Sequence, residues 1–213
     1  MCGRFTLFSP KEQIEATFKL PFSPTISYSP RWNISPGQTS LVALSNKTNI
    51  IEAIWGLKTS ALAKYKPINI RVETIKQNNF YSKLAKTNRI AVIANGYYEW
   101  QSLEAKNKQP WYFFSESETL VGLAGIYAID ANNPNTVTFA ILTTEAQAKF
   151  QSIHNRQPVI LSPQESIEWL ISPDIKIKEL ITNSYRLKLN AYRVSTLVNK
   201  SKIDLPQLIN SID

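Results

Sequence analysis

The chain has 213 residues, of which 43% are hydrophobic and 19% charged, a composition typical of a folded protein with its own core. One cysteine excludes an internal disulfide, and one cysteine with one histidine excludes a metal cluster of those ligands, so we expect no metal and no cofactor. No apolar run is long enough for a membrane span, and the first residues lack the layout of a signal peptide. We therefore expect a cytoplasmic protein. The net charge of +8 favours a polyanionic partner such as nucleic acid, although lysines that serve solubility would give the same charge.

The only cysteine, Cys2, lies next to the first residue. Removal of Met1 would leave Cys2 with an α-amine and a thiol on adjacent carbons, and both groups titrate near neutral pH. Such an aminothiol condenses with an aldehyde to a Schiff base, which the thiol closes to a thiazolidine ring. It could instead attack an acyl carbon, as in N-terminal-nucleophile hydrolases. An incidental thiol is the alternative, but Gly3 and Arg4, suited to close approach and to anion binding, favour a functional one.

The first third of the chain predicts a helix followed by a hairpin. Ser9-Pro10-Lys11-Glu12 has the form of a capping box and predicts a helix to about Leu20. Ser35-Pro36-Gly37 predicts a turn before a strand, although the ring of Pro36 could also wedge between DNA bases. Leu41–Ser45 and Asn49–Trp55 then read as two strands of a hairpin. Residues 58–67 are rich in lysine and indicate a surface loop.

Polar and apolar residues alternate from Ile68 to Thr74. In an extended conformation Asn69, Arg71 and Glu73 would share one face. This face could be the wet side of a half-buried edge strand, or it could be a functional surface.

A helix at Asn79–Lys86 and a strand at Arg89–Ala94 lead into the aromatic segment Gly96–Trp100. Glu99 lies between aromatic residues of this segment. A carboxyl group in such surroundings is partly desolvated, which raises its pKa and suits a general acid. A solvent-facing glutamate on an aromatic strand is the alternative.

The second half of the chain alternates short strands with short helices, joined by a polar loop at residues 101–110 and a turn at Asp130–Asn135. Strands are predicted at Trp111–Phe114, Thr119–Ala128, Val137–Thr143 and Leu189–Val194, and helices at Thr144–Phe150, Ser162–Ile171 and Asp174–Thr182. The helices at Thr144 and Ser162 begin with further capping-box patterns. We see no repeat or linker, so we predict a single α+β domain over residues 1–213, with a mainly antiparallel, barrel-like sheet and peripheral short helices.

His154 is the only histidine and precedes a short apolar strand after Pro158. A lone histidine is usually structural. Here Arg156 follows two residues later, and an imidazole beside a guanidinium in a loop at the start of a buried strand is typical of a substrate-binding segment.

Six short motifs occur in order along the chain and together resemble the SOS-response-associated peptidase (SRAP) family of abasic-site-processing proteins. They are Cys2-Gly3-Arg4-Phe5, Trp32-Asn33-Ile34-Ser35-Pro36-Gly37, Trp55-Gly56-Leu57, Asn69-Ile70-Arg71-Val72-Glu73-Thr74, Gly96-Tyr97-Tyr98-Glu99-Trp100 and His154-Asn155-Arg156-Gln157-Pro158. Each motif alone is weak, but six in register are specific. The resemblance runs from Cys2 to at least Leu161.

The resemblance implies a sensor of abasic sites in single-stranded DNA. An abasic site is in equilibrium with an open-chain aldehyde, the partner that an aminothiol needs. Cys2 resembles the family nucleophile that forms a thiazolidine crosslink, and members are also described as autopeptidases, since the preceding residue must be removed. Asn69 matches the asparagine that holds the cysteine terminus, Glu99 the acid that opens the sugar, and His154 the histidine that steadies the Schiff base.

The resemblance also implies a set of DNA contacts. Arg4, Arg71 and Arg156 match phosphate-binding arginines, and the full set expected at the DNA is Arg4, Asn33, Pro36, Arg71, Trp100, Thr143 and Arg156. Such a basic channel with stacked bases suits a single strand. One departure stands out: many members follow Trp-Gly-Leu with proline and tryptophan, whereas this chain has Ala61 and Leu62 nearby, so an aromatic platform is missing.

Two other functions remain open at this point. A peptidase that acts on other proteins would use the same Cys2, Asn69 and His154 but needs an oxyanion hole and a peptide groove. A non-covalent reader of modified DNA would leave Cys2 idle. In each case we expect a monomer without a membrane or metal partner.

Overall fold

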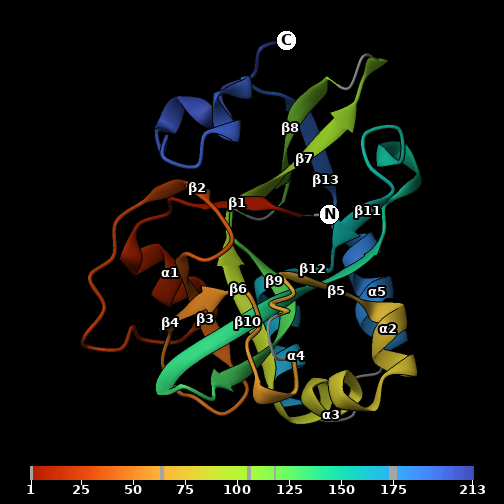
Figure 1. Cartoon of the computed structure of the whole chain (residues 1–213). Helices are drawn as coiled ribbons and strands as arrows, with labels where there is room; N and C mark the ends of the chain where they lie inside the picture. Colours follow the sequence, from red (N-terminus) through yellow and green to blue (C-terminus); the bar gives the residue numbers. More distant parts are fainter. Residues whose placement is uncertain (1, 63–64, 105–106, 118, 173–176) are drawn as a thin grey trace.

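The backbone is built mainly from antiparallel strands, which a computed structural model describes together with the helices for residues 2–62, 65–104, 107–117, 119–172 and 177–213 (Figure 1). The strands are β1 (Arg4–Leu7), β2 (Arg31–Ile34), β3 (Thr39–Leu44), β4 (Ile51–Trp55), β5 (Asn69–Arg71), β6 (Arg89–Ala94), β7 (Gly96–Ser102), β8 (Lys108–Ser115), β9 (Val121–Asp130), β10 (Asn133–Glu145), β11 (Arg156–Pro158), β12 (Ile160–Leu161) and β13 (Leu189–Arg193).

Five of these strands close into a barrel. Their order is β10-β4-β3-β6-β9, and β9 also pairs with β10, which completes the ring. Only the β10–β4 pair within this ring is parallel. Closure leaves no unpaired edge in the ring, while β5, β11 and β12 pair with its rim. The predicted α+β fold with a barrel-like, mainly antiparallel sheet is therefore confirmed.

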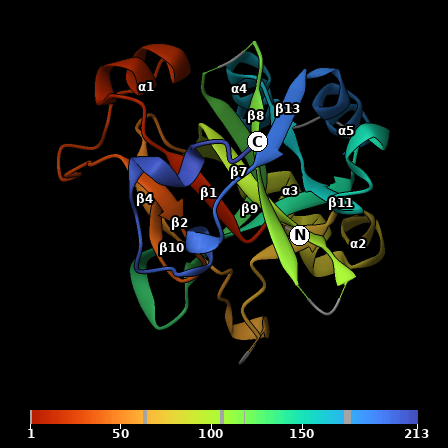
Figure 2. The ribbon, with the colours of Figure 1, turned by 90° about the horizontal axis from the view of Figure 1, so that it is seen from above.

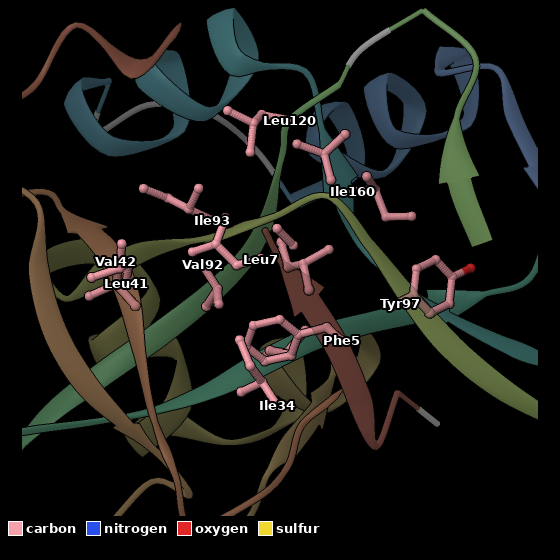
Figure 3. Close-up of a cluster of buried hydrophobic side chains, with 14 of the residues drawn as sticks. Phe5, Leu7, Ile34, Leu41, Val42, Val92, Ile93, Tyr97, Leu120 and Ile160 are labelled. Atoms are coloured by element: carbon pink, nitrogen blue, oxygen red, sulfur yellow. The ribbon is translucent and has the colours of Figure 1, made fainter. Parts of the chain in front are cut away.

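A second sheet has the order β13-β8-β7-β1-β2 and lies above the barrel in Figure 1. Side chains of β1 and β2 point into the same cluster as those of β3 and β6 (Figure 3). Phe5, Val92 and Ile93 are fully buried there. Burying a large apolar side chain contributes about 1.5–3 kcal/mol, so this shared core fixes the second sheet on the barrel.

Helices flank the barrel, and α1 and α2 lie on opposite sides of the molecule in both views (Figures 1 and 2). The helices are α1 (Lys11–Phe18), α2 (Val72–Gln77), α3 (Asn79–Thr87), α4 (Pro163–Ile171) and α5 (Ile177–Arg186), with 3₁₀ turns at Ser60–Leu62, Ala148–Phe150, Thr196–Asn199 and Pro206–Ile209. Among the described residues no helix is long and apolar enough to cross a membrane. The predicted start of the helix at Asp174 lies outside the described residues.

Only one of the three predicted capping boxes forms. Ser162 accepts from the backbone N–H of Glu165 at 3.2 Å, and the Glu165 carboxylate accepts from the N–H of Ser162 at 2.9 Å. Helix α1 forms as predicted, but its box does not, because Ser9 accepts from the Asn95 side chain instead. The box predicted at Thr144 is wrong, since Thr144 still belongs to β10, and only a 3₁₀ turn follows.

The prediction of an extended segment from Ile68 to Thr74 is partly wrong. Strand β5 pairs with β10 only as far as Arg71, and α2 begins at Val72. Buried Val72 and Ile75 lie one helical turn apart and turn the chain onto the barrel. The turn at Pro36 forms as predicted, because Gly37 has a φ of 86° and the N–H of Gln38 bonds to Ser35 at 3.1 Å.

The C-terminal segment is tied to β2 by buried polar groups. The amide nitrogen of Asn33 donates to the carbonyls of Val198, Lys200 and Ile203 at 3.2, 3.2 and 2.7 Å. The carboxylate of Asp204 accepts from the backbone N–H groups of Trp32 and Asn33. Asn33 itself is fully buried, so these bonds replace water that it cannot reach.

We predict that Asn33→Ala lowers the free energy of unfolding by about 2 kcal/mol or more, because it removes the donor of three backbone carbonyls that are buried or partly buried. Urea unfolding followed by tryptophan fluorescence measures this loss. The control is Asn132→Ala, at an exposed asparagine of the β9–β10 turn. If Asn33→Ala loses no more unfolding free energy than Asn132→Ala, the hydrogen bonds of the Asn33 amide do not stabilise the fold as proposed.

Candidate functional site

Cys2 is fully buried at the head of β1. Its thiol donates to the carbonyl of Arg4 over 3.7 Å, and its own carbonyl accepts from the Asn69 side chain at 2.8 Å. Burial and the nearby Glu99 raise the pKa of the thiol far above its usual range. The thiol is therefore protonated at rest, and a base must take its proton before sulfur can react.

Glu99 reaches the same place from β7. The strands β1 and β7 are antiparallel, with Arg4 opposite Tyr98, so one further step brings Gly3 opposite Glu99. Glu99 is 2% exposed, and burial raises its pKa to about 7. At neutral pH this carboxyl can both give and take a proton, which is the property that a general acid needs.

Tyr97 shares its face of β7 with Glu99 because the two residues are two positions apart. Its ring stacks on Phe113 with centroids 4.8 Å apart. Burial and the neighbouring Glu99 and Cys2 raise the pKa of its hydroxyl, so Tyr97 remains neutral. Its part in the wall of the site was missed from the sequence, where it reads as one aromatic residue among several.

His154 lies in the loop between the 3₁₀ turn at Ala148–Phe150 and β11. Its ring nitrogen Nδ1 accepts from the backbone N–H of Arg156 at 3.0 Å, so the ring hydrogen of the neutral form belongs on Nε2. Burial lowers the pKa of the imidazole, the charges of Lys108 and Arg156 lower it slightly further, and the backbone hydrogen bond to Arg156 opposes this shift. The ring is therefore neutral at physiological pH and offers Nε2–H as a donor.

Two open clefts meet at the loop that carries His154. The first is lined by Glu99, Trp100, Ser102, Lys108, His154 and Asn199. The second is lined by Arg71, Glu145, Gln151, Asn155 and Arg156. The loop thus has an acid–base face and an arginine face, and Lys108 and Asn199 are cleft residues that the sequence motifs did not indicate.

Asn69, Arg71 and Glu73 come to the site from β5 and the first turn of α2. Asn69 binds the Cys2 carbonyl, while its amide oxygen is buried and makes no hydrogen bond within the described part of the chain. Arg71 is exposed at the end of β5. Glu73 forms a bidentate ion pair with Arg156, which also donates to the carbonyl of Thr143.

The remaining predicted DNA contacts fall into two groups. Arg4, Pro36 and Trp100 are half-buried, and Trp100 donates to Asn199 at 2.7 Å beside the first cleft. Asn33 and Thr143 are fully buried. Asn33 holds the C-terminal segment, and the Thr143 hydroxyl bonds to the Ile70 carbonyl, so neither side chain is brought to the surface of the site.

Ala61 and Leu62, where the resemblance led us to expect a missing aromatic platform, lie in the 3₁₀ turn after β4. The turn offers no aromatic ring among its three residues. The described residues also contain no group of three or more His, Cys, Asp or Glu side chains able to hold a metal ion.

Fold and site together define a barrel protein whose reactive groups gather at the head of its first strand. The model of the family described as SOS response associated peptidase (SRAP) matches residues 1–201, and the chain belongs to this family. The family assignment made from the six motifs is confirmed.

Similar proteins match most of this chain. A Bacillus subtilis protein named abasic site processing protein YoqW is 34% identical, over 99% of this chain and 100% of its own. The Escherichia coli protein of the same description, YedK, is 29% identical over 80% of this chain and 79% of its own. A solved structure from Bacteroides thetaiotaomicron superposes with a TM-score of 0.80 over 99% of both chains, at 20% identity, and shows the same fold.

We predict that Glu99 makes stability depend on pH. Its pKa rises from 4.5 in the unfolded chain to about 7 in the fold, so the folded state binds more protons between these values. The contribution of Glu99 to the free energy of unfolding is fully present below about pH 4.5. It falls by about 3 kcal/mol as the pH rises to about 7.

Glu99→Gln should remove this decline, so the variant gains stability relative to the wild type as pH rises. Urea unfolding of both proteins at pH 5, 6, 7 and 8 measures the difference, which cancels the titration of all other groups. Glu116→Gln, at an exposed position, is the control. Parallel curves for wild type and Glu99→Gln would mean that burial does not perturb this carboxyl.

Proposed function

We propose that this protein processes abasic sites in single-stranded DNA by forming a thiazolidine crosslink through Cys2 once Met1 has been removed. The observation that carries the proposal is the placement of the Cys2 thiol, buried beside Glu99, with its carbonyl bound by Asn69. The names of the relatives, which describe them as abasic site processing proteins, support the same substrate.

The proposed chemistry needs one aldehyde and releases one water. The α-amine of Cys2 adds to the aldehyde carbon of the opened sugar, and the resulting hydroxyl leaves as water after protonation, which gives a Schiff base. The thiol then adds across the C=N bond, sulfur to carbon and hydrogen to nitrogen, which closes the ring. Met1 must first be removed, either by the protein itself or by an aminopeptidase, because a blocked amine cannot attack the aldehyde.

Each neighbouring group has a role in this scheme. Glu99, with a pKa of about 7, gives a proton to the leaving oxygen and takes one from the thiol. The unpartnered amide oxygen of Asn69 can accept from the α-amine. His154 presents Nε2–H to the sugar oxygen, and Arg4 and Arg71 bring positive charge for the phosphates, whereas the guanidinium of Arg156 is bonded to Glu73 and to the Thr143 carbonyl.

The remaining surface suits a single strand. The first cleft offers Trp100 as a stacking face and Lys108 as a cation, and Pro36 is half-buried in its turn. The proposed DNA path leaves out Asn33 and Thr143, whose side chains are buried. A peptidase acting on other proteins and a non-covalent DNA reader are outcomes of the test below.

We predict that a protein with a free Cys2 amine forms an adduct with an abasic single-stranded oligonucleotide that survives boiling in detergent. Intact mass should equal the sum of protein and DNA less one water. Cys2→Ser and Cys2→Ala can form a Schiff base but no stable ring, so borohydride should trap an adduct that boiling otherwise destroys.

A short tag ahead of Cys2 is the matched control, because it blocks the amine while the fold stays intact. An equally strong crosslink from the tagged protein or from Cys2→Ala would exclude the thiazolidine route. Binding without any covalent adduct would favour the non-covalent reader, and turnover of a peptide would favour the peptidase.

We predict that Arg71→Ala weakens binding to single-stranded DNA and flattens its salt dependence by roughly 0.7 in the slope of log K against log salt, as one phosphate contact is lost. Arg71 is exposed in the second cleft, so the substitution leaves the core intact. Fluorescence anisotropy over a range of salt concentrations measures the slope. Lys47→Ala, an exposed cation in the β3–β4 hairpin, is the control for net charge. An unchanged slope for Arg71→Ala would move the DNA path away from this cleft.

A further inference from the structure

We propose that Glu73 is a positioning residue that holds the ring of His154 through Arg156. The inference rests on the proposed function for its effect on rate, but its structural part is independent of the reaction. In the sequence Glu73 is one of three polar residues on a predicted strand, and its partner Arg156 lies 83 positions away.

The first step is the geometry of the ion pair. Glu73 Oε1 lies 2.9 Å from Arg156 Nη1, and Oε2 lies 3.0 Å from Nη2. Nη2 also donates to the Thr143 carbonyl at 2.7 Å. Two parallel bonds and a third to a barrel strand hold the planar guanidinium in one orientation. The side chain of Arg156 is 10% exposed, so this arrangement is largely shielded from water.

The second step leads from Arg156 to His154. The backbone N–H of Arg156 donates to Nδ1 of the imidazole at 3.0 Å. The Arg156 carbonyl, which belongs to the next peptide unit, lies 3.2 Å from the same nitrogen, so a small change in the backbone angles of Arg156 would favour the other tautomer, with the hydrogen on Nδ1. The position of the Arg156 backbone therefore decides whether Nε2 faces the first cleft as a donor.

The third step concerns which segments the ion pair joins. Glu73 is in the first turn of α2, directly after β5, which carries Asn69 and Arg71. Arg156 begins β11, directly after the loop of His154. Both segments pair with β10, where Thr143 is opposite Arg71 and Glu145 is opposite Arg156. The ion pair thus ties the segment that binds Cys2 to the segment that carries the imidazole.

A simpler role for Glu73 is electrostatic. Its side chain is 50% exposed, and a carboxylate near a phosphate path repels DNA, so its removal would only raise affinity. Glu145 provides the matched control, since it lies in the same cleft as Arg156 and is exposed. Glu145→Gln removes the same charge without touching the ion pair.

The first readout is NMR of the imidazole, which is unambiguous because the chain has one histidine. Nitrogen shifts should show the Nε2–H tautomer in the wild type and in Glu145→Gln, and a mixture of both tautomers in Glu73→Gln and Glu73→Ala. In an Arg156→Ala background, Glu73→Gln should produce no further change. A wild-type tautomer in Glu73→Gln and Glu73→Ala would overturn the proposal, and so would a further change in the Arg156→Ala background.

The second readout is the single-turnover rate of crosslinking at saturating abasic DNA. Glu73→Gln should lower this rate roughly tenfold without raising the DNA concentration needed for half-saturation, because it disturbs orientation rather than binding. Glu145→Gln, which removes the same charge from the cleft but leaves the ion pair intact, should lack this tenfold loss of rate even where it changes DNA affinity. Equal rates for wild type and Glu73→Gln would overturn the catalytic consequence. A wild type that forms no crosslink contradicts the proposed function alone, since the tautomer measurement still decides the positioning role.

Discussion

The pairing of β1 between β2 and β7 is the constraint on which the site depends. An interior strand of a sheet must satisfy its backbone on both sides, and β1 pairs with β7 from Arg4 and with β2 from Phe5. Fully buried Phe5 anchors this strand against Trp55, with ring centroids 5.1 Å apart. Cys2 is therefore held in the interior only two residues ahead of β1, and the β7 partner brings Glu99 beside it.

Local sequence patterns predicted the elements better than the contacts of individual side chains. The strands and the turn at Gly37 follow from alternation and from the need for a positive φ, which are local properties. Whether Ser9 caps a helix depends on Asn95, 86 residues away, which takes its hydroxyl as an acceptor. The same limit applies to β5, whose early end is set by the packing of Val72 and Ile75 on the barrel.

The candidate site shows the same division between residue identity and residue placement. The sequence indicated Cys2 and His154 because they are its only cysteine and histidine, and Glu99 because aromatic residues flank it. Asn33 lies in another of the six motifs and Thr143 lies outside them, and both were expected at the DNA, yet their side chains bond to backbone carbonyls. A motif identifies residues that belong to a family pattern, but it does not tell whether a given side chain stabilises the fold or contacts the substrate. The ion pair of Glu73 with Arg156 joins residues 83 positions apart and has no local signature.

Burial has a consequence for the order of the proposed steps. A thiol whose pKa is raised by burial and by a neighbouring carboxyl is a weak nucleophile at rest. Under the proposed function the α-amine therefore attacks first, and sulfur follows once the Schiff base has formed and a base can accept the thiol proton. Glu99 can serve as that base because it has just given its proton to the departing oxygen, and a pKa of about 7 allows both transfers near neutral pH. The same burial that keeps the free thiol protonated thus raises the pKa of Glu99 to a value at which this carboxyl can later activate the thiol.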